Sequence, residues 1–420
     1  MQTQPVLLFF NKAKTNVFAY QRSFLMNLNW NLNKETNVLT IELEGKLSST
    51  NAQETEDALM QIYSQNTCTA LELDASKLEY VSSAGLRVIL KMFKMQKNFK
   101  ITNVCRDVYD IFEMTGFSEL MTVEKALREI NVDDCEVIGV GGHCKVLRLN
   151  ADTIIKLLIP GTPLEDAERE REYAKKAFVM GLPTAIPFDV VKCGDSIGLV
   201  FEMVDSDTLS AFLNKNPHRF EEFAVKYAKL MKQLHATKVD DDVLASTKIL
   251  YRERIERLQT LGYFNDQEIA DLHRINDAFS DDRCIIHGDY HPKNVMVMGD
   301  ELVLIDMADI TYGDPLYDLG SMMLTHVTVT GERKESITGL KSEMVDNLWR
   351  IFISVYLETA DAKKIEITMK KAGIFAMLKA ATALAFSPGA NKDYIIKHVT
   401  DMARTNLLSN TEGCLALLKM

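Results

Sequence analysis

The stretch "IIHGDYHPKNVMVMGDELVLIDMADI", residues 285–310, decides the fold of the longer part of this chain. Two apolar runs flank a Gly-Asp pair, and Gly299 in the first position of a two-residue loop favours a tight II′ hairpin turn. Counting residue pairs outward from that turn predicts that Asn294 and Asp306 meet at the open end. An amide oxygen and a carboxylate are hard oxygen ligands, which suit Mg²⁺ bound together with phosphate. Asp289 precedes them in a loop that can turn back over this end.

The order of these polar residues is also informative. His287-Gly-Asp289, then Asn294 and, after a strand, Asp306 follow the order of the catalytic and metal-binding residues of kinases. In that arrangement Asp289 positions the acceptor hydroxyl and takes its proton. Asn294 and Asp306 hold Mg²⁺ on the nucleotide phosphates, and catalysis is mostly positioning and charge neutralisation. We expect His287 to brace the loop rather than to transfer protons.

Upstream, residues 135–158 contain three short β-rich pieces, which predict an antiparallel meander. The first turn, "GVGGHCKV", is rich in glycine, so its backbone amides can approach nucleotide phosphates. A plain hairpin turn is the competing interpretation. The candidate phosphate-binding glycines are Gly139, Gly141 and Gly142.

Lys156 lies in the middle of the apolar strand "TIIKLL", where a lysine is unfavourable unless it is paired. In kinases such a lysine binds the α- and β-phosphates and pairs with a glutamate of the next helix. The candidates are Glu168, Glu170 and Glu172. We favour Glu170, with Glu172 next, because Glu170 shares a helix face with Ala174, Ala177 and Phe178.

The segment "LVFEMVD", residues 199–205, follows two further predicted strands over 187–193 and 196–203. It crosses to a region that is mostly helical, and backbone groups of Glu202 to Val204 are placed to bind adenine. Apolar residues recur at helical spacing over residues 219–236, 342–360, 365–386 and 393–408. We therefore predict one two-lobed unit, with an N-lobe over 131–204 and a helical C-lobe over 205–420.

Residues 26–130 alternate strand and helix patterns, which predicts a separate α/β domain with a central sheet. Asn37–Gly45 alternates apolar and polar residues as a half-buried strand does. Thr69–Asp74 reads as a short strand followed by a loop. Next comes Ser82-Ser83-Ala84-Gly85, which opens a helix. The simplest role for serine there is helix capping, and a role in phosphorylation is compatible with it because a helix N-terminus favours phosphate.

"LDASKLEYVSSAGLRVILKMFK" resembles the STAS domain of anti-sigma factor antagonists, and the resemblance covers about residues 30–128. In that family the serine two residues before the glycine is the phosphoacceptor, which implies Ser83. The family often has aspartate just before the acceptor, whereas this chain has Ser82. The resemblance also implies a partner for this module, either an anti-sigma-like protein or another regulatory protein.

"HGDYHPKN" and "LIDMADITYGDPLYDLG", together with the glycine-rich turn and Lys156, resemble the aminoglycoside phosphotransferase and choline kinase branch of the protein-kinase-like fold. The resemblance spans about residues 133–420. It implies an α+β two-lobed domain, ATP and Mg²⁺ as cofactors, and a hydroxyl-bearing small molecule or protein as acceptor. Met307-Ala308 stands where protein kinases have Phe-Gly, and nothing obvious marks an aminoglycoside pocket.

Composition sets wider limits. A chain of 420 residues is long enough for two or three domains, and its net charge of −11 argues against broad nucleic-acid binding while leaving a local basic patch open. Seven scattered cysteines without a CxxC pair indicate neither a disulfide framework nor a zinc site, so a reducing cytoplasm is expected. No apolar run is long enough to span a membrane. Residues 1–25 show no clear element, so we expect a loosely held extension or a natural start at Met26.

The leading hypothesis is thus an ATP- and Mg²⁺-dependent phosphotransferase with a regulatory STAS module. Its expected fold class is an α/β STAS domain plus an α+β two-lobed protein-kinase-like domain. One alternative is a non-catalytic regulator that senses nucleotide or acts as an anti-sigma antagonist. The other is a kinase that phosphorylates Ser83 of its own STAS module.

Overall fold

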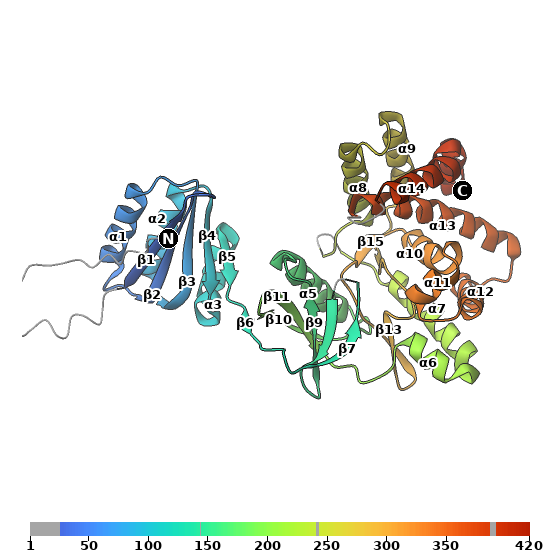
Figure 1. The fold of residues 1–420 in the computed structure, drawn as a ribbon, viewed down its shortest axis with the longest axis horizontal. Helices are drawn as coiled ribbons and strands as arrows, with labels where there is room; N and C mark the ends of the chain where they lie inside the picture. The colour runs from blue at the N-terminus through green and yellow to red at the C-terminus, as the bar shows by residue number, and fades with distance from the viewer. Residues whose placement is uncertain (1–25, 143, 241–242, 387–391) are drawn as a thin grey trace, which may run out of the picture. The chain divides into compact units, whose positions relative to one another are not determined.

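The structure is a computed structural model that describes residues 26–142, 144–240, 243–386 and 392–420 (Figure 1). The predicted extension over residues 1–25 lies outside the described residues. The chain divides into two compact units, the first ending at Arg128 and the second running from Glu129 to Met420. Among the described helices, none is long and apolar enough to cross a membrane.

The first unit is built on a five-stranded sheet in the order β1-β2-β3-β4-β5. β1 is antiparallel to β2 and the remaining pairs are parallel. The predicted alternation is confirmed, since Leu39, Ile41 and Leu43 are fully buried. The elements are β1 (Asn27–Asn33), β2 (Val38–Leu47), α1 (Ala52–Gln65), β3 (Ala70–Val81), α2 (Ser83–Met95), β4 (Phe99–Val104), α3 (Arg106–Met114), α4 (Phe117–Leu120) and β5 (Thr122–Lys125).

The prediction that the second strand ends near Asp74 was wrong. β3 continues to Val81 and pairs with β2 along its length, with two register shifts at which β3 carries an extra residue, one between Asp74 and Lys77 and one between Leu78 and Tyr80. The irregular pairing explains the error: Ala75, Leu78 and Val81 are buried at a spacing of three, not two. The sequence pattern therefore stops looking like a strand before the strand itself ends.

The second unit begins with a strand-rich lobe whose sheet has the order β6-β10-β11-β9-β8-β7. The predicted meander and the two later strands are confirmed, and β10, β11, β9, β8 and β7 pair antiparallel in that order. The helix α5 contacts β10 and β11. The elements are β6 (Arg128–Glu129), β7 (Glu136–Val140), β8 (Cys144–Arg148), β9 (Thr153–Leu158), α5 (Leu164–Val179), β10 (Pro187–Cys193) and β11 (Ser196–Glu202).

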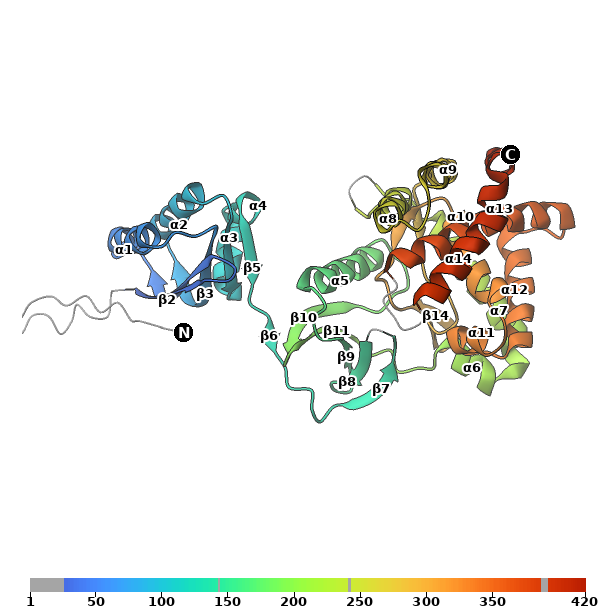
Figure 2. The same cartoon turned by 45° about the horizontal axis from the view of Figure 1, so that its top comes forward.

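The helical lobe follows, and the four predicted helices are confirmed as α7, α12, α13 and α14. α8, α9, α13 and α14 gather in one part of this lobe (Figure 2), around a core that includes Phe375 and Leu378. The helices are α6 (Leu209–Lys215), α7 (Phe220–Ala236), α8 (Thr247–Leu261), α9 (Asp266–Asp277), α10 (Leu316–Met323), α11 (Gly331–Thr338), α12 (Ser342–Leu357), α13 (Ala362–Ala383), α14 (Lys392–Asn406) and α15 (Thr411–Lys419). Short helical turns are η1 (Pro217–Arg219), η2 (Leu324–Thr328), η3 (Leu384–Phe386) and η4 (Leu408–Asn410).

Two small antiparallel ribbons lie within the helical lobe and carry its polar loops. One joins β12 (Cys284–Ile286) to β15 (Thr311–Gly313), and the other joins β13 (Val295–Met298) to β14 (Glu301–Leu304). Since β12 is followed by the loop that holds Asp289, and β15 is preceded by the loop that holds Asp306, pairing of β12 with β15 brings the two loops side by side.

Candidate functional site

The β13–β14 hairpin has the predicted register. Val295 pairs with Leu304, and Gly299 has a φ of 63°, as the first position of a II′ turn requires. Beyond the last strand pair, the Ile305 amide donates to the Asn294 carbonyl at 3.0 Å. Asn294 and the residue after Ile305 are therefore neighbours at the open end.

That residue, Asp306, adopts a left-handed backbone conformation with a φ of 62°, which is uncommon outside glycine. Its Oδ1 accepts from Lys156 Nζ at 2.8 Å, across 150 residues of sequence. The side chain of Asp306 remains 42% exposed, so its other oxygen is accessible. The strained backbone thus turns the carboxylate away from the strand and toward the strand-rich lobe.

Lys156 makes the second predicted contact, because its Nζ donates to Glu170 Oε1 at 2.6 Å. Glu172, the second choice, instead lies 4.0 Å from Lys176 on the partly exposed face of α5. Burial lowers the pKa of Lys156, but the carboxylates of Asp306 and Glu170 outweigh that effect and raise it above its ordinary value. The lysine is therefore a fixed positive charge between the two lobes.

Asn294 connects the open end of the hairpin to the loop of Asp289. Its Nδ2 donates to the Asp289 carbonyl at 3.0 Å and lies 3.4 Å from Asp289 Oδ2. These bonds orient the amide so that its Oδ1 has no hydrogen bond within the described part of the chain. Asn294 Oδ1 and Asp306 Oδ2 are thus two hard oxygen donors at one hairpin end, which fits Mg²⁺, an ion that needs few protein ligands when phosphate supplies others.

Asp289 has partners that were not predicted from the sequence. His291 Nε2 lies 3.5 Å from Asp289 Oδ2. Burial raises the pKa of Asp289, but the hydrogen bond and charge of His291 and the charges of Lys379 and His287 outweigh burial and lower it to about 2. No sequence signal marks Lys379, which lies 90 residues further along the chain on α13.

A buried carboxylate supports the loop from behind. Asp318 is fully buried and accepts from the backbone amides of His287 and Gly288 at 2.8 Å each. Its Oδ2 also lies 3.1 Å from His235 Nε2, on α7. Burial raises the pKa of Asp318, but these partners outweigh it and lower the pKa. Asp318 therefore holds the backbone of this loop by hydrogen bonds, with His235 as its further partner.

The loop also requires a glycine at 288. Gly288 has a φ of 83°, and a Cβ placed there would lie 2.7 Å from the Asp309 carbonyl oxygen. Only a residue without a side chain allows the loop of Asp289 to approach the loop of Asp306 this closely.

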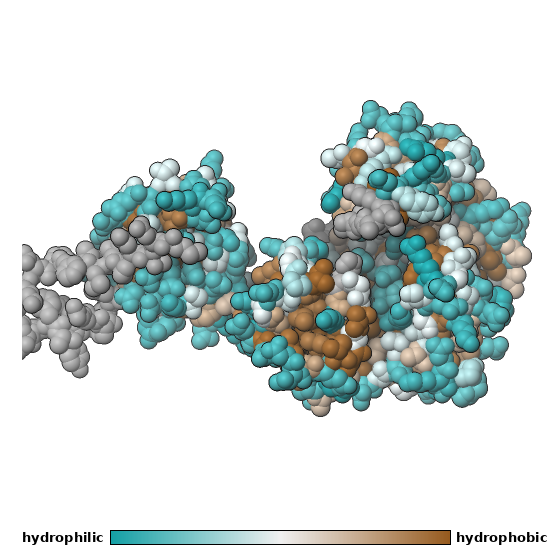
Figure 3. Space-filling model, viewed as in Figure 1, coloured by the Kyte–Doolittle hydropathy of each residue, from teal (hydrophilic) through white to brown (hydrophobic). Residues whose placement is uncertain are grey.

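The remaining predicted nucleotide-binding residues belong to the strand-rich lobe. Gly139 lies on β7, and Gly141 and Gly142 follow it in the turn before β8, where the Gly141 amide donates to the Cys144 carbonyl at 2.9 Å. At the end of β11, a central strand of the sheet, the Glu202 amide is bonded to the Ile186 carbonyl. The Val204 amide has no hydrogen-bond partner among the residues described. Figure 3 shows a recess between the strand-rich and helical lobes.

The predicted phosphoacceptor belongs to the first unit. The Ser82 side chain accepts from the Gly85 amide at 3.2 Å and so caps α2, as expected for this position. Ser83 is exposed in the first turn of the helix. Gly85 is required by packing, because a Cβ there would lie 2.7 Å from the Leu47 carbonyl oxygen.

Comparison with known proteins adds family assignments to this geometry. Residues 144–340 match the family model described as "Phosphotransferase enzyme family", and residues 29–130 match the STAS domain. A stretch of 102 residues is 24% identical to an anti-sigma-B factor antagonist of Listeria monocytogenes serovar 1/2a, covering 23% of this chain and 89% of that protein.

Similar solved structures include an aminoglycoside phosphotransferase and a choline/ethanolamine kinase family protein. An ADP-bound aminoglycoside phosphotransferase, APH(2'')-Ib, is 17% identical, covers 65% of this chain and 93% of its own, and has a TM-score of 0.46. A choline/ethanolamine kinase family protein from Mesorhizobium loti is 13% identical, covers 68% and 92%, and has a TM-score of 0.45.

Both resemblances drawn from the sequence are confirmed, and with them the fold class of an α/β STAS domain plus an α+β two-lobed kinase-like domain. The chain therefore joins a STAS domain at residues 29–130 to a domain of the phosphotransferase enzyme family at residues 144–340.

Proposed function

We propose that the second unit transfers the γ-phosphate of ATP to a hydroxyl acceptor, with Mg²⁺ as cofactor. The observation that supports this most strongly is the contact of Lys156 with Asp306, from positions 150 residues apart, beside Asn294 and Asp289. A lysine, two hard oxygen ligands and a carboxylate in one place are the groups that phosphoryl transfer requires.

In this proposal the strand-rich lobe binds the nucleotide. Lys156, held by Glu170, binds the α- and β-phosphates. Backbone amides of the glycine-rich turn, residues 139–142, cover the phosphates. The free amide of Val204 and the carbonyl of Glu202 bind the adenine edge, since the Glu202 amide is already used within the sheet.

Asn294 Oδ1 and Asp306 Oδ2 would hold Mg²⁺. The ion, when bound, supplies positive charge that neutralises the phosphates. Two protein ligands suffice because Mg²⁺ commonly keeps several waters and takes further oxygens from the substrate phosphates.

Asp289 is the catalytic residue of the proposal. A carboxylate with a pKa of about 2 is ionised at neutral pH and is a weak base. We therefore assign it mainly to orienting the acceptor hydroxyl, which also fits a loose transition state in which proton transfer is late.

The test is a screen of hydroxyl acceptors with Mg–ATP, including the protein itself, for wild type and Asp289→Asn. We expect wild type to phosphorylate an acceptor and Asp289→Asn to be slower by roughly 10²–10⁴-fold while still binding Mg–ATP. Asp300→Asn, at the exposed turn of the same hairpin, is the matched control and should keep full activity. A wild-type protein that binds no Mg–ATP would refute the proposal, and equal rates for Asp289→Asn would refute the role of Asp289.

We further propose that the STAS domain binds a regulatory protein and that Ser83 is phosphorylated. The exposure of Ser83 at a helix N-terminus favours a phosphate there, and the curated relatives of this domain are named anti-sigma-B factor antagonists. The second unit is a candidate kinase for this serine. Mass spectrometry after incubation with Mg–ATP tests this: phosphate on Ser83 in wild type but not in Asp289→Asn supports phosphorylation by the chain itself, and unmodified Ser83 in both excludes it.

A further inference from the structure

A pocket lies beside the catalytic loop, among α8, α10, α13 and the loops of Asp289 and Asp306. Two of its lining residues are neighbours of the proposed site. Gly288 directly precedes Asp289, and Asp309 follows Asp306 by three residues. Leu250 and Phe375 contribute apolar surface. The pocket thus adjoins both the proposed catalytic residue and the proposed metal site, where an acceptor has to lie.

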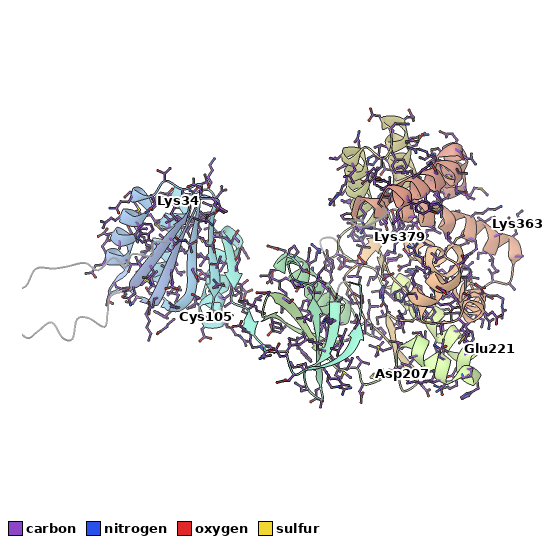
Figure 4. All side chains as sticks on the ribbon, viewed as in Figure 1. Lys34, Cys105, Asp207, Glu221, Lys363 and Lys379 are labelled. Atoms are coloured by element: carbon purple, nitrogen blue, oxygen red, sulfur yellow. The ribbon has the colours of Figure 1, made fainter. Side chains whose placement is uncertain are left out.

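Lys379 on α13 gives this pocket a positive charge. Its Nζ donates to the Gly288 carbonyl at 2.6 Å and to Ser321 Oγ at 3.0 Å. Neither partner is charged, and no carboxylate forms a salt bridge with Lys379 among the residues that the structure describes. Figure 4 labels this residue on the side of the helical lobe that faces the strand-rich lobe. Its charge acts on the nearby Asp289 carboxylate without forming a salt bridge, and the ammonium group keeps a remaining donor that can bind an anion.

Arg254 on α8 adds a second positive charge to the same wall. Its guanidinium stacks over Tyr251, with 4.9 Å from Cζ to the ring centroid, and lies 5.4 Å from the ring of Phe386. Its Nε is buried without a hydrogen-bond partner. Within the described ranges, no acidic side chain forms a salt bridge with it. A planar guanidinium that two rings hold in place is suited to bind a carboxylate or phosphate.

Asp309 is the one carboxylate among the residues that line the pocket, so the lining carries two positive charges and one negative charge. Asp309 is exposed, whereas Arg254 and Lys379 are each partly buried. Because charges interact more strongly away from water, the two cations dominate the pocket.

We propose, resting on the phosphotransfer function above, that this pocket takes the acceptor and that the acceptor is a small alcohol carrying a carboxylate or phosphate group bound by Arg254 and Lys379. The anionic group anchors one end of the molecule on α8 and α13, and a hydroxyl at the other end reaches Asp289. An acceptor whose charge is mainly positive, such as an aminoglycoside or choline, is disfavoured by the same two residues.

The test measures binding by titration calorimetry on the full chain with Mg–ADP held saturating. Four probes share a three-carbon skeleton: glycerate, glycerol 3-phosphate, uncharged glycerol and the cationic 2-amino-1,3-propanediol. We expect glycerate or glycerol 3-phosphate to bind at least about tenfold more tightly than the other two, and the better of them identifies the anionic group. Glycerol or the amine binding as tightly as both anions, or no binding of any probe, would overturn the inference.

Two variants locate the effect. Arg254→Gln should weaken binding of the preferred anion by about tenfold, whereas Arg257→Gln, one helical turn away and stacked on the same Phe386, should not. Lys379→Met should weaken it too and serves if Arg254→Gln does not fold. An unchanged affinity of Arg254→Gln for the preferred anion contradicts the inference. If Arg254→Gln does not fold, an unchanged affinity of Lys379→Met contradicts it instead. Binding of Mg–ADP is measured first: its absence refutes the proposed function, whereas Mg–ADP binding without a preference for anions refutes only the acceptor class.

Discussion

Two supports position the same loop in different ways: the open end of the β13–β14 hairpin and the buried pair of Asp318 and His235. The hairpin places Asn294 next to Asp306 by strand register, from residues close in sequence, and Asp306 is partly exposed. Asp318 instead lies fully buried, 31 residues after His287 and 83 residues after its partner His235. The proposed metal ligands are thus placed by local pairing, whereas the position of the proposed catalytic aspartate depends on tertiary packing.

The strongest way to break the buried support is Asp318→Asn. The amide group would face backbone donors and leave at least one buried hydrogen bond unmade, so we expect a loss of about 3–5 kcal/mol in the free energy of unfolding. Urea unfolding of this variant and of Asp195→Asn, an exposed control in the β10–β11 turn, measures the difference. A loss below about 1 kcal/mol would show that the loop does not depend on this carboxylate.

The hairpin end is expected to respond in function rather than in stability. Asp306→Asn removes one of two proposed Mg²⁺ ligands and the ion pair with Lys156, so the Mg²⁺ affinity of the ATP-bound protein should fall at least about tenfold. Because Asp306 is 42% exposed, the midpoint of unfolding should change little. A Mg²⁺ titration in the presence of ATP, set beside a urea curve, checks both parts, and unchanged Mg²⁺ affinity would contradict the assignment.

A substitution in the turn of the hairpin should have a smaller effect on stability. Gly299→Ala places a side chain at a φ of 63° with no atom within 4 Å of the new Cβ, so only backbone strain of about 1–2 kcal/mol is expected. Asp289 should keep its position, since its loop is held by Asp318. Thermal unfolding measures the strain, and Mg–ATP binding that stays within about twofold of wild type confirms that the site survives.

The smallest expected effect is a dependence of stability on pH. The folded-state pKa of Asp318 is lowered, so its contribution to stability is present above the unfolded value of 3.8 and is lost as the pH falls through the folded value. His235→Gln removes one cause of the lowering, so its stability should fall less steeply between about pH 5 and 3. Urea midpoints over this range, with the exposed His218→Gln as control, measure the slopes; equal slopes in all three proteins would exclude a role for His235.

Much of the fold followed from residue patterns. The meander, the four helices and the hairpin register were predicted because each depends on residues close in sequence. The signal is either the spacing of apolar residues or the identity of a turn residue. β3 was predicted too short because its pairing with β2 is irregular, and burial there no longer follows a period of two. His291, Lys379 and His235 were missed for a different reason. The first two contact the loop of Asp289 and the third contacts Asp318 behind it, in each case through space and without a sequence pattern of its own.

By itself the sequence determined that Asn294 lies beside Asp306, since a two-residue turn leaves the hairpin one register, and that Lys156 needs a carboxylate, since an apolar strand does not tolerate a lone charge. Only the tertiary structure decided which glutamate and which loop meet that lysine, because both partners come from elements that packing brings together. It alone also placed Arg254 and Lys379 around one pocket beside Asp289, from helices more than a hundred residues apart. Because these two charged residues lie on helices far apart in the sequence, no local pattern of residues marks the pocket.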